Sequence, residues 1–379
     1  MHLIMKLSKL CNLRCTYCYE YDELANKDRM SLEGIEFFFK NMADYVIKQE
    51  KNFPLSLIFH GGEALLLPHN YLRAICQLRD KYFTKNGIDT RTTVQSNLFK
   101  ISSKTLDLLE ELEIHLGFSL DVFGEQRLDI AGKVSQDQVL DNLQILLDRQ
   151  IPVGGISVLH ALNVDKAVQT YQFYNELGID YRILPIHSSR EIVPARMSNL
   201  LLSYQQTINA LKMVAKAQFS QVSNITVQPL NEYFQAAVRY LINSTIDVYN
   251  PYIHDWAWIV NTNGDVYPHG DAYLPEGLMG NIFQQTVNEI FQSLAFANVT
   301  NNRIQRGEVC RSCQFDRKCN QIAITEAIPS ERVYDSAGIL QCSIAKPMIE
   351  FMIDEIRHSP DTQSIFEVYK SPVLVGEFY

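Results

Sequence analysis

Three cysteines near the start of the chain have a spacing that suits metal chemistry. Cys11, Cys15 and Cys18 form the pattern C-x-x-x-C-x-x-C, and an aromatic residue, Tyr17, precedes the last of them. Three thiolates at this spacing could hold three irons of a cubane 4Fe–4S cluster and leave the fourth iron open to a small molecule. A zinc loop or unrelated core cysteines are the alternatives, although a lone triad is a poor tetrahedral set for zinc.

A second group of cysteines lies near the other end of the chain. Cys310, Cys313 and Cys319 have the spacing C-x-x-C-x5-C, and Cys342 follows. Four thiolates saturate either one 4Fe–4S cluster or one zinc ion. Judged in isolation, this group favours zinc.

Short polar motifs follow apolar segments at three further places. These motifs are His60-Gly61-Gly62-Glu63, Gln95-Ser96-Asn97 and Ser119-Leu120-Asp121. The two glycines would let the backbone approach a ligand closely, and Glu63 could hold a cationic amino group. The alternative for each polar side chain is a cap at the end of a strand.

The segments around these motifs alternate between strand-like and helix-like patterns. The predicted strands are Leu3–Leu7, Leu55–Phe59, Thr92–Gln95, His115–Leu120, Pro152–Leu159 and Tyr181–Leu184. The predicted helices between them are Leu32–Glu50, Tyr71–Lys85, Ser103–Leu112, Gln136–Gln150 and Val164–Leu177. Such alternation predicts an α/β fold with a parallel sheet rolled into a partial, TIM-like (β/α)6 barrel, whose sites gather at the carboxyl ends of the strands.

The triad and the three strand-end motifs together resemble the radical S-adenosyl-L-methionine (SAM) enzymes. The resemblance implies that Cys11, Cys15 and Cys18 ligate a 4Fe–4S cluster and that Tyr17 lies beside the adenine of SAM. It implies further contacts to SAM, with the methionine amino end held by Gly61, Gly62 and Glu63, and ribose or carboxylate groups held by Ser96, Asn97 and Ser119. It also implies reductive cleavage of SAM to a 5′-deoxyadenosyl radical that abstracts hydrogen from a substrate. Asp121 is a candidate proton acceptor or a strand cap.

The region after residue 250 resembles the SPASM domain and its shortened relative, the twitch domain, which bind auxiliary iron–sulfur clusters. The full pattern places cysteines where this chain has His269, Gln285 and Ala323. These departures imply that one auxiliary cluster is absent and that one remains, ligated by Cys310, Cys313, Cys319 and Cys342. His269 is more simply a polar residue than a ligand, and Cys76 is expected in the core.

Four regions are expected along the chain. They are a radical SAM partial barrel at 1–189, a helical bridge at 190–250, an α+β auxiliary-cluster domain at 251–345, and a final helix and tail at 346–379. The bridge should contain the helices Leu200–Phe219 and Leu230–Ile242, with no strand between them. Trp256–Val260 and Asp265–Tyr267 flank an Asn-Gly turn and predict a hairpin, Ser343–His358 predicts a helix, and the last twenty residues show no periodicity.

Composition narrows the classes of partner. The chain has 379 residues and a net charge of −9, which disfavours nucleic acid and anionic membrane surfaces as partners. No apolar run reaches transmembrane length, and the sequence has no signal peptide. Eight cysteines without a secretion signal suggest thiols or metal ligands in a reducing cytoplasm.

Radical SAM proteins with such extensions often modify ribosomally made peptides, so the resemblance implies an oxidative cross-link on a precursor peptide. A carbon–carbon cyclophane is the leading expectation, with a thioether or ether as further products. Epimerisation, excision of a tyrosine-derived unit and sulfatase-type side-chain oxidation are the enzymatic alternatives, and a zinc-binding scaffold protein is the non-enzymatic one. Expected partners are the precursor peptide and an external electron donor such as flavodoxin or ferredoxin. With no room expected before Leu3 or after Cys342 for a leader-binding domain, a leader would be read by a separate leader-recognition protein, by the bridge or by the auxiliary domain.

Overall fold

The computed structural model describes residues 1–49, 54–186, 194–220, 223, 225–247, 249–251 and 257–369 of the chain. The chain divides into two compact units. The first contains Met1–Leu120, Glu125–Gly154 and Asn250–Ile304, and the second contains Asp121–Gly124, Gly155–Tyr249 and Gln305–Tyr379. Each unit is described by itself.

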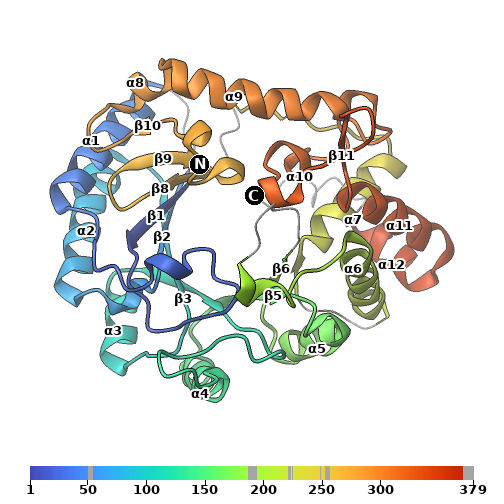
Figure 1. Cartoon of the computed structure of the whole chain (residues 1–379), viewed down its shortest axis with the longest axis horizontal. Coiled ribbons are helices and arrows are strands. Elements are labelled where there is room, and N and C mark those ends of the chain that lie inside the picture. Colours follow the sequence, from blue (N-terminus) through green and yellow to red (C-terminus); the bar gives the residue numbers. More distant parts are fainter. Residues whose placement is uncertain are drawn as a thin grey trace. The chain divides into compact units, whose positions relative to one another are not determined.

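The first unit is built on a sheet whose strands run in the order β10-β9-β8-β1-β2-β3-β4 (Figure 1). Its strands are β1 (His2–Ser8), β2 (Leu55–Gly61), β3 (Thr90–Ser96), β4 (Ile114–Ser119), β8 (Ala257–Val260), β9 (Asp265–Pro268) and β10 (Gly280–Asn281). Strands β1 to β4 are parallel, and β8 adds to β1 in the same direction. Strands β8, β9 and β10 are antiparallel, so an up-and-down extension continues a parallel core.

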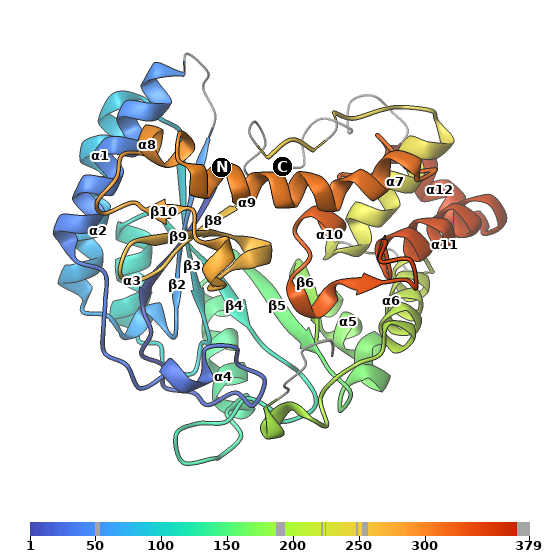
Figure 2. The ribbon, with the colours of Figure 1, turned by 45° about the horizontal axis from the view of Figure 1, so that its top comes forward.

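Helices separate the parallel strands of the first unit, as the βαβ pattern requires. They are α1 (Leu32–Lys48), α2 (His69–Tyr82), α3 (Ser103–Glu111) and α4 (Gln136–Asp148). Figure 2 shows α1 and α2 side by side on one side of the strands. Helix α1 begins where the side chain of Ser31 accepts a hydrogen bond from the N–H of Gly34, an N-cap that its sequence predicts. Its buried face, including Phe38 and Phe39, contributes to the core.

The second unit contains a smaller parallel set of strands and most of the later helices. Its strands are β5 (Val153–Leu159, from Gly155 onward), β6 (Tyr181–Pro185), β7 (Val227–Gln228), and the short pair β11 (Val333–Tyr334) and β12 (Leu340–Gln341). Its helices are α5 (Ala167–Glu176), α6 (Tyr204–Phe219), α7 (Leu230–Leu241), α10 (Ile322–Thr325), α11 (Ala345–His358) and α12 (Pro360–Tyr369). Strands β5, β6 and β7 are parallel, and β11 pairs with β12 in antiparallel fashion.

All six predicted barrel strands are present, and the α/β class with parallel strands is confirmed. The predicted hairpin is also present. Gly264 has a positive φ of 89° at its turn, where its N–H donates to the carbonyl of Asn261 at 2.9 Å. Trp256, the predicted first residue of that hairpin, lies outside the described residues.

One expectation about secondary structure is wrong, and helices α9 (Leu294–Gly307) and α12 were not predicted from the sequence. The predicted helical bridge contains the strand β7, whose two residues are too few to give an alternating pattern. Helix α9 was not expected, because its polar Asn, Gln and Thr residues mask the helical period. Helix α12 was missed in a tail that shows no clear periodicity, and it begins directly after α11.

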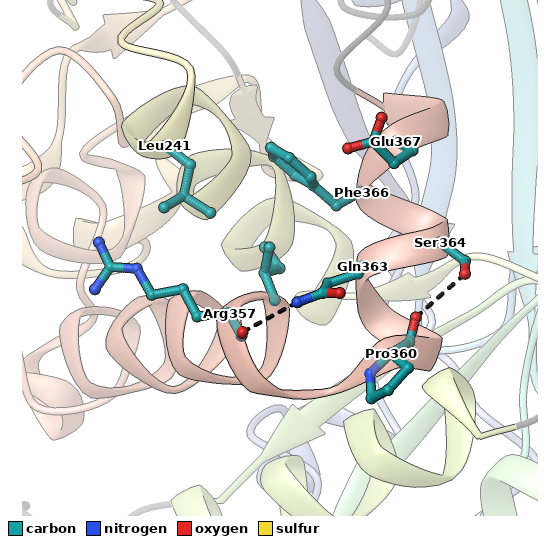
Figure 3. A pocket seen from close by; sticks show the side chains of 8 residues that line it. Leu241, Arg357, Pro360, Gln363, Ser364, Phe366 and Glu367 are labelled. Atoms are coloured by element: carbon teal, nitrogen blue, oxygen red, sulfur yellow. Dashed lines mark hydrogen bonds between the residues drawn. The ribbon is translucent and has the colours of Figure 1, made fainter.

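Helices α11 and α12, together with α7, line an open hollow of about 710 Å³ (Figure 3). Leu241, Ile356 and Phe366 give it an apolar wall, and Arg357 and Glu367 add charges. None of its lining residues belongs to the predicted site, and Arg357 lies about 20 Å along α11 from the end that follows Cys342. Among the described residues, no helix is both long and apolar enough to cross a bilayer.

Candidate functional site

The cysteine loop follows β1 in the first unit. Cys11 is buried, whereas Cys15 and Cys18 are partly exposed, and none of the three forms a disulfide. The loop closes through hydrogen bonds from the N–H of Cys11 to Leu24 O and from the N–H of Cys18 to Cys15 O, each at 3.0 Å. Cys11, Leu13 and Leu24 form a small buried cluster beneath it. The three predicted ligands therefore lie in one compact loop.

A segment more than a hundred residues later pairs with this loop. The N–H groups of Arg14 and Thr16 donate to the carbonyls of Leu128 and Gln126 at 2.6 and 3.0 Å. Leu128 also forms a bridge with Val134, so the segment is one arm of a hairpin. The hairpin therefore supplies the loop with an antiparallel backbone partner.

Arg127 lies on that hairpin arm and reaches the aromatic residue of the triad. Its Nη1 donates to Tyr17 Oη at 3.2 Å, and the residue is 7 % exposed. The same cation favours the charged form of Glu63 and acts to lower its pKa. Tyr17, which the resemblance placed beside adenine, is thus held by its hydroxyl from the hairpin.

The two glycines at the end of β2 allow the backbone to lie close to the segment that leads into the cysteine loop. Gly61 has a φ of 136°, and a Cβ there would lie 1.9 Å from the carbonyl oxygen of Ser8. A Cβ on Gly62 would lie 2.3 Å from Lys9 O and 2.5 Å from Leu10 O. Both glycines are therefore required by the chain that leads into the cysteine loop.

Glu63 joins the ends of β2 and β3. Its Oε1 accepts from the N–H of Leu65 at 3.0 Å, and its Oε2 accepts from the N–H of Asn97 at 2.6 Å. Burial raises the pKa of Glu63, and these hydrogen bonds act against that rise. The carboxylate is thus anchored at the strand ends, and its remaining lone pairs are the part that a cationic amino group could use.

The polar residues of the next two strands are also engaged. The side-chain amide of Asn97 donates to Asn12 Oδ1 at 2.8 Å and lies 3.6 Å from Cys11 Sγ. Ser96 Oγ accepts from the N–H of Leu98 at 3.0 Å, and Ser119 Oγ accepts from the side chain of Gln95 at 3.0 Å. The structure therefore brings Asn97 to the cysteine loop. A hydrogen bond from the Ser96 side chain acts to lower the pKa of Glu63, and Ser119 on β4 contacts Gln95 on β3.

Asp121, the predicted catalytic group, belongs to the second unit. Its Oδ1 accepts from the N–H of Val158 on β5 at 2.7 Å, and the side chain is 4 % exposed. This contact matches the alternative interpretation of Asp121 as a strand cap.

The second cysteine group lies within the second unit. Cys310 sits in a short 3-10 turn (Glu308–Ser312), Cys313 ends that turn, and Cys342 lies between β12 and α11. Burial, together with the nearby thiols of Cys319, Cys342 and Cys313, raises the pKa of Cys310 to about 12. The four predicted ligands are therefore near one another.

Both thiol groups receive N–H donors at sulfur. Cys11 Sγ accepts from the N–H of Leu13 at 3.4 Å, and Cys342 Sγ accepts from the N–H of Lys346 at 3.3 Å. Thiolate sulfur is a far better acceptor than thiol sulfur, so these donors fit cysteines held as thiolates by a cationic centre.

Among the residues that the structure describes, no three His, Cys, Asp or Glu side chains converge as a cage for one metal ion. The ligands of a 4Fe–4S cluster need not converge on one ion, because each thiolate binds a different iron. The donor set therefore suits iron–sulfur clusters.

The remaining sequence candidates are His269, Gln285 and Cys76. His269 begins a 3-10 turn in the first unit, and Gln285 Oε1 accepts from the N–H of Asn281 at 2.8 Å. Cys76 is 1 % exposed in α2, and burial raises its pKa to about 11. Its expected core position is confirmed.

Sequence reasoning missed a buried polar cluster in the first unit. Lys6 is 1 % exposed and pairs with Glu20 Oε1 at 3.2 Å, while His60 and Tyr273 complete the group. The available signal was a lysine in an otherwise apolar strand, together with an acid two residues after the last cysteine of the triad.

Comparison with known families matches two regions of the chain to family models. Residues 5–174 match the model of the radical SAM superfamily, and residues 254–314 match that of the SPASM iron–sulfur cluster-binding domain. The chain contains a radical SAM domain followed by a SPASM domain. SAM and iron–sulfur clusters are therefore its cofactors, as its sequence motifs imply.

Curated relatives of this chain include two sulfatase-maturating enzymes. The cysteine-type anaerobic sulfatase-maturating enzyme of Clostridium novyi is 24 % identical over 333 residues, covering 84 % of this chain and 86 % of the relative. The serine-type anaerobic sulfatase-maturating enzyme of Bacteroides thetaiotaomicron is 25 % identical over 350 residues, covering 84 % and 81 %.

Two solved structures show a similar fold. The anaerobic sulfatase-maturating enzyme anSMEcpe, with bound AdoMet and a Cp18Cys peptide, has a TM-score of 0.74 at 17 % identity, with 97 % and 99 % of the two chains covered. SuiB of Streptococcus suis, bound to its precursor peptide SuiA, has a TM-score of 0.57 at 15 % identity, with 89 % and 75 % covered.

Proposed function

We propose that this enzyme introduces an oxidative cross-link into a ribosomally made precursor peptide, with a carbon–carbon cyclophane as the leading product. The observation that carries the proposal is the single complete set of four thiols, Cys310, Cys313, Cys319 and Cys342, grouped in the second unit. Four protein ligands leave no open iron, so this site suits electron transfer better than substrate binding.

The first unit is proposed to hold SAM and its cluster. Cys11, Cys15 and Cys18 would ligate the cluster, and Glu63 would receive the amino group of SAM. When bound, these cofactors supply a 5′-deoxyadenosyl radical that takes a hydrogen atom from the substrate. The hairpin beside the loop and the glycine contacts hold the thiols in place. Tyr17, Ser96, Asn97 and Ser119 stay predicted SAM contacts, and Asp121 stays a predicted proton acceptor.

Electron balance favours an auxiliary acceptor in this reaction. Forming one bond in place of two bonds to hydrogen releases one hydrogen atom, one electron and one proton. The hydrogen atom goes to the 5′-deoxyadenosyl radical, and the four-thiolate site would take the electron. A buried carboxylate or solvent would take the proton.

The cluster content tests the proposed acceptor. Anaerobically reconstituted wild type should contain about eight irons per chain, and a variant with the four second-unit cysteines changed to alanine should contain about four. A wild type with about four irons and one zinc would contradict the oxidative mechanism. A redox-neutral reaction such as epimerisation would then be favoured.

A peptide panel tests the substrate class. The panel consists of cysteine-type and serine-type sulfatase peptides and a synthetic library of peptides in which Trp, Tyr or Phe neighbours a polar residue. We expect the enzyme to cleave SAM and to remove two hydrogen atoms from members of the library, detected by mass spectrometry. Retention of both hydrogens in every library member would contradict the cross-link.

Sulfatase-type side-chain oxidation is the second candidate function, because two sulfatase-maturating enzymes align over 84 % of this chain. The absence of cysteine at positions 269, 285 and 323, where a further auxiliary cluster would be ligated, counts against it. Conversion of the Cys or Ser in the sulfatase peptides to an aldehyde, with the library unmodified, would favour this function.

We also propose three features of the cellular setting. An external one-electron donor such as flavodoxin or ferredoxin would reduce the SAM cluster, and a separate protein would present the leader of the precursor peptide. Eight free cysteines support a reducing cytoplasm as the compartment. Dependence of turnover on added flavodoxin, compared with dithionite, tests the first of these proposals.

A further inference from the structure

A buried ammonium group lies at the carboxyl end of the parallel strands in the first unit. Lys6 on β1 and His60 on β2 are direct partners in the sheet register, so their side chains lie on the same face. The Lys6 ammonium is 3.2 Å from Glu20 Oε1, 3.2 Å from His60 Nδ1 and hydrogen bonded to the hydroxyl of Tyr19. Tyr273 donates to the same Glu20 oxygen at 2.9 Å.

The contacts of the His60 ring determine where its proton lies. Nδ1 accepts from the N–H of Gly61 at 2.7 Å and faces the Lys6 ammonium, so both neighbours act as donors toward it. Burial and the adjacent Lys6 charge keep the pKa of His60 well below its usual value, so the ring is neutral. The single ring proton must therefore be on Nε2.

The Nε2–H group is available to a ligand. His60 is partly exposed, and Nε2 makes no hydrogen bond to any of the residues that the structure describes. The opposite nitrogen is fixed by two donors, which leaves the ring little freedom to turn. His60 thus presents one oriented donor at the end of β2.

This donor lies close to the proposed radical chemistry. His60 directly precedes the Gly61–Gly62 turn, which packs against the backbone leading into the cysteine loop. Glu20, which holds Lys6, comes two residues after Cys18. Sites in barrels of parallel strands gather at this edge of the sheet.

The charge balance of the cluster indicates the chemistry of the ligand. The Glu20 carboxylate compensates the Lys6 ammonium at 3.2 Å, and the His60 ring adds no charge. A subsite without net positive charge does not favour an anion such as phosphate. One oriented N–H suits a neutral oxygen acceptor, such as the carbonyl of a peptide bond or of a side-chain amide.

We propose that His60 is a substrate-positioning residue whose Nε2–H donates to a carbonyl oxygen of the peptide substrate, with its ring fixed by Lys6 and Glu20. This inference rests on the proposed function, because it requires a peptide substrate. Its role is to hold the substrate carbon that loses hydrogen at a constant distance from the radical.

A pair of variants at His60 tests the inference. His60→Gln keeps a terminal N–H donor at a similar reach, whereas His60→Leu removes it. The probe is the member of the peptide panel that the wild type modifies. We expect His60→Leu to raise KM about tenfold and to release more 5′-deoxyadenosine per peptide product, and His60→Gln to restore most of both.

The controls separate positioning from folding. Iron content and SAM binding should stay at the wild-type value in both variants. His115→Leu, at an exposed histidine on β4 of the same unit, should behave as wild type. Equal KM and equal coupling in His60→Leu and wild type would overturn the inference while leaving the proposed function intact. A wild type that modifies no member of the panel would overturn both.

Discussion

The side-chain amide of Asn97 donates to Asn12 Oδ1 at 2.8 Å and lies within hydrogen-bonding distance, 3.6 Å, of Cys11 Sγ. The N–H of Leu13 is a second donor to the same sulfur, at 3.4 Å. If Cys11 ligates the cluster, as proposed, Asn97 acts on a cluster ligand. Hydrogen bonds to cluster sulfurs stabilise the more negative, reduced state and so raise the reduction potential.

Replacing Asn97 with leucine should lower the reduction potential of the SAM cluster. The variant loses one N–H donor to Cys11, and we expect a shift on the order of tens of millivolts. A redox titration monitored by electron paramagnetic resonance measures it. Ser102→Ala, which removes the hydroxyl that caps α3 instead, should leave the potential unchanged. An unchanged potential in Asn97→Leu would show that the amide does not act on the cluster.

Lys346→Pro should lower the potential of the auxiliary cluster. Lys346 is the second residue of α11, and its N–H is 3.3 Å from Cys342 Sγ. Proline removes that N–H at a position where the first turn of a helix tolerates it. Lys346→Ala keeps the N–H while removing the charge, and its potential should stay near that of the wild type. Equal shifts in both variants would assign the effect to the side chain.

Gly62→Ala should destabilise the first unit by roughly 1–3 kcal/mol and deplete iron at the triad. Its Cβ would lie 2.3 Å from Lys9 O, a backbone atom that cannot move aside alone. Gly117→Ala is a matched control, because its Cβ would meet only the flexible end of Gln95, at 2.6 Å. We expect a cost of about 1 kcal/mol or less there. Thermal unfolding and iron analysis compare the two, and equal losses would contradict the close approach.

Glu331→Gln should remove a pH dependence of stability. Burial raises the pKa of Glu331, and Arg182 acts against that rise. A carboxyl whose pKa is higher in the folded state gives stability that is complete below the unfolded pKa, near 4.5, and is lost as pH rises through the folded value. The glutamine variant should therefore gain thermal stability relative to wild type as pH rises from about 4 to 7. A difference in melting temperature that stays constant with pH would contradict the raised pKa.

The strands and the triad could be predicted because their signals are local. Most of β1 to β6 are rich in apolar or β-branched residues, and the spacing of Cys11, Cys15 and Cys18 is visible in the sequence without any tertiary information. β7 and α9 could not be predicted from pattern. A strand of two residues is too short to show alternation, and the many polar residues of α9 obscure its helical period. The α12 segment depends on its packing against earlier helices rather than on pattern.

The contacts within the candidate site depended on tertiary structure. The sequence pattern did not predict that Gly61 and Gly62 lie close to the backbone of Ser8 to Leu10. This close approach depends on the register between β1 and β2. The same holds for Lys6 and His60, which are 54 residues apart. For Asp121, the sequence predicted the position at a strand end. It did not decide whether the side chain is a proton acceptor or a cap.

The backbone pairing of the cysteine loop with Leu128 and Gln126 has a consequence for biogenesis. The loop leaves the ribosome first, and its partner arm follows only after β2, β3 and β4 have been made. The loop can take its final shape only once that arm has been synthesised. Backbone contacts to Leu24 and Leu128 hold the loop, and the second of these needs a segment that is made much later. We therefore expect iron to reach the triad only after residues 126–128 have been synthesised.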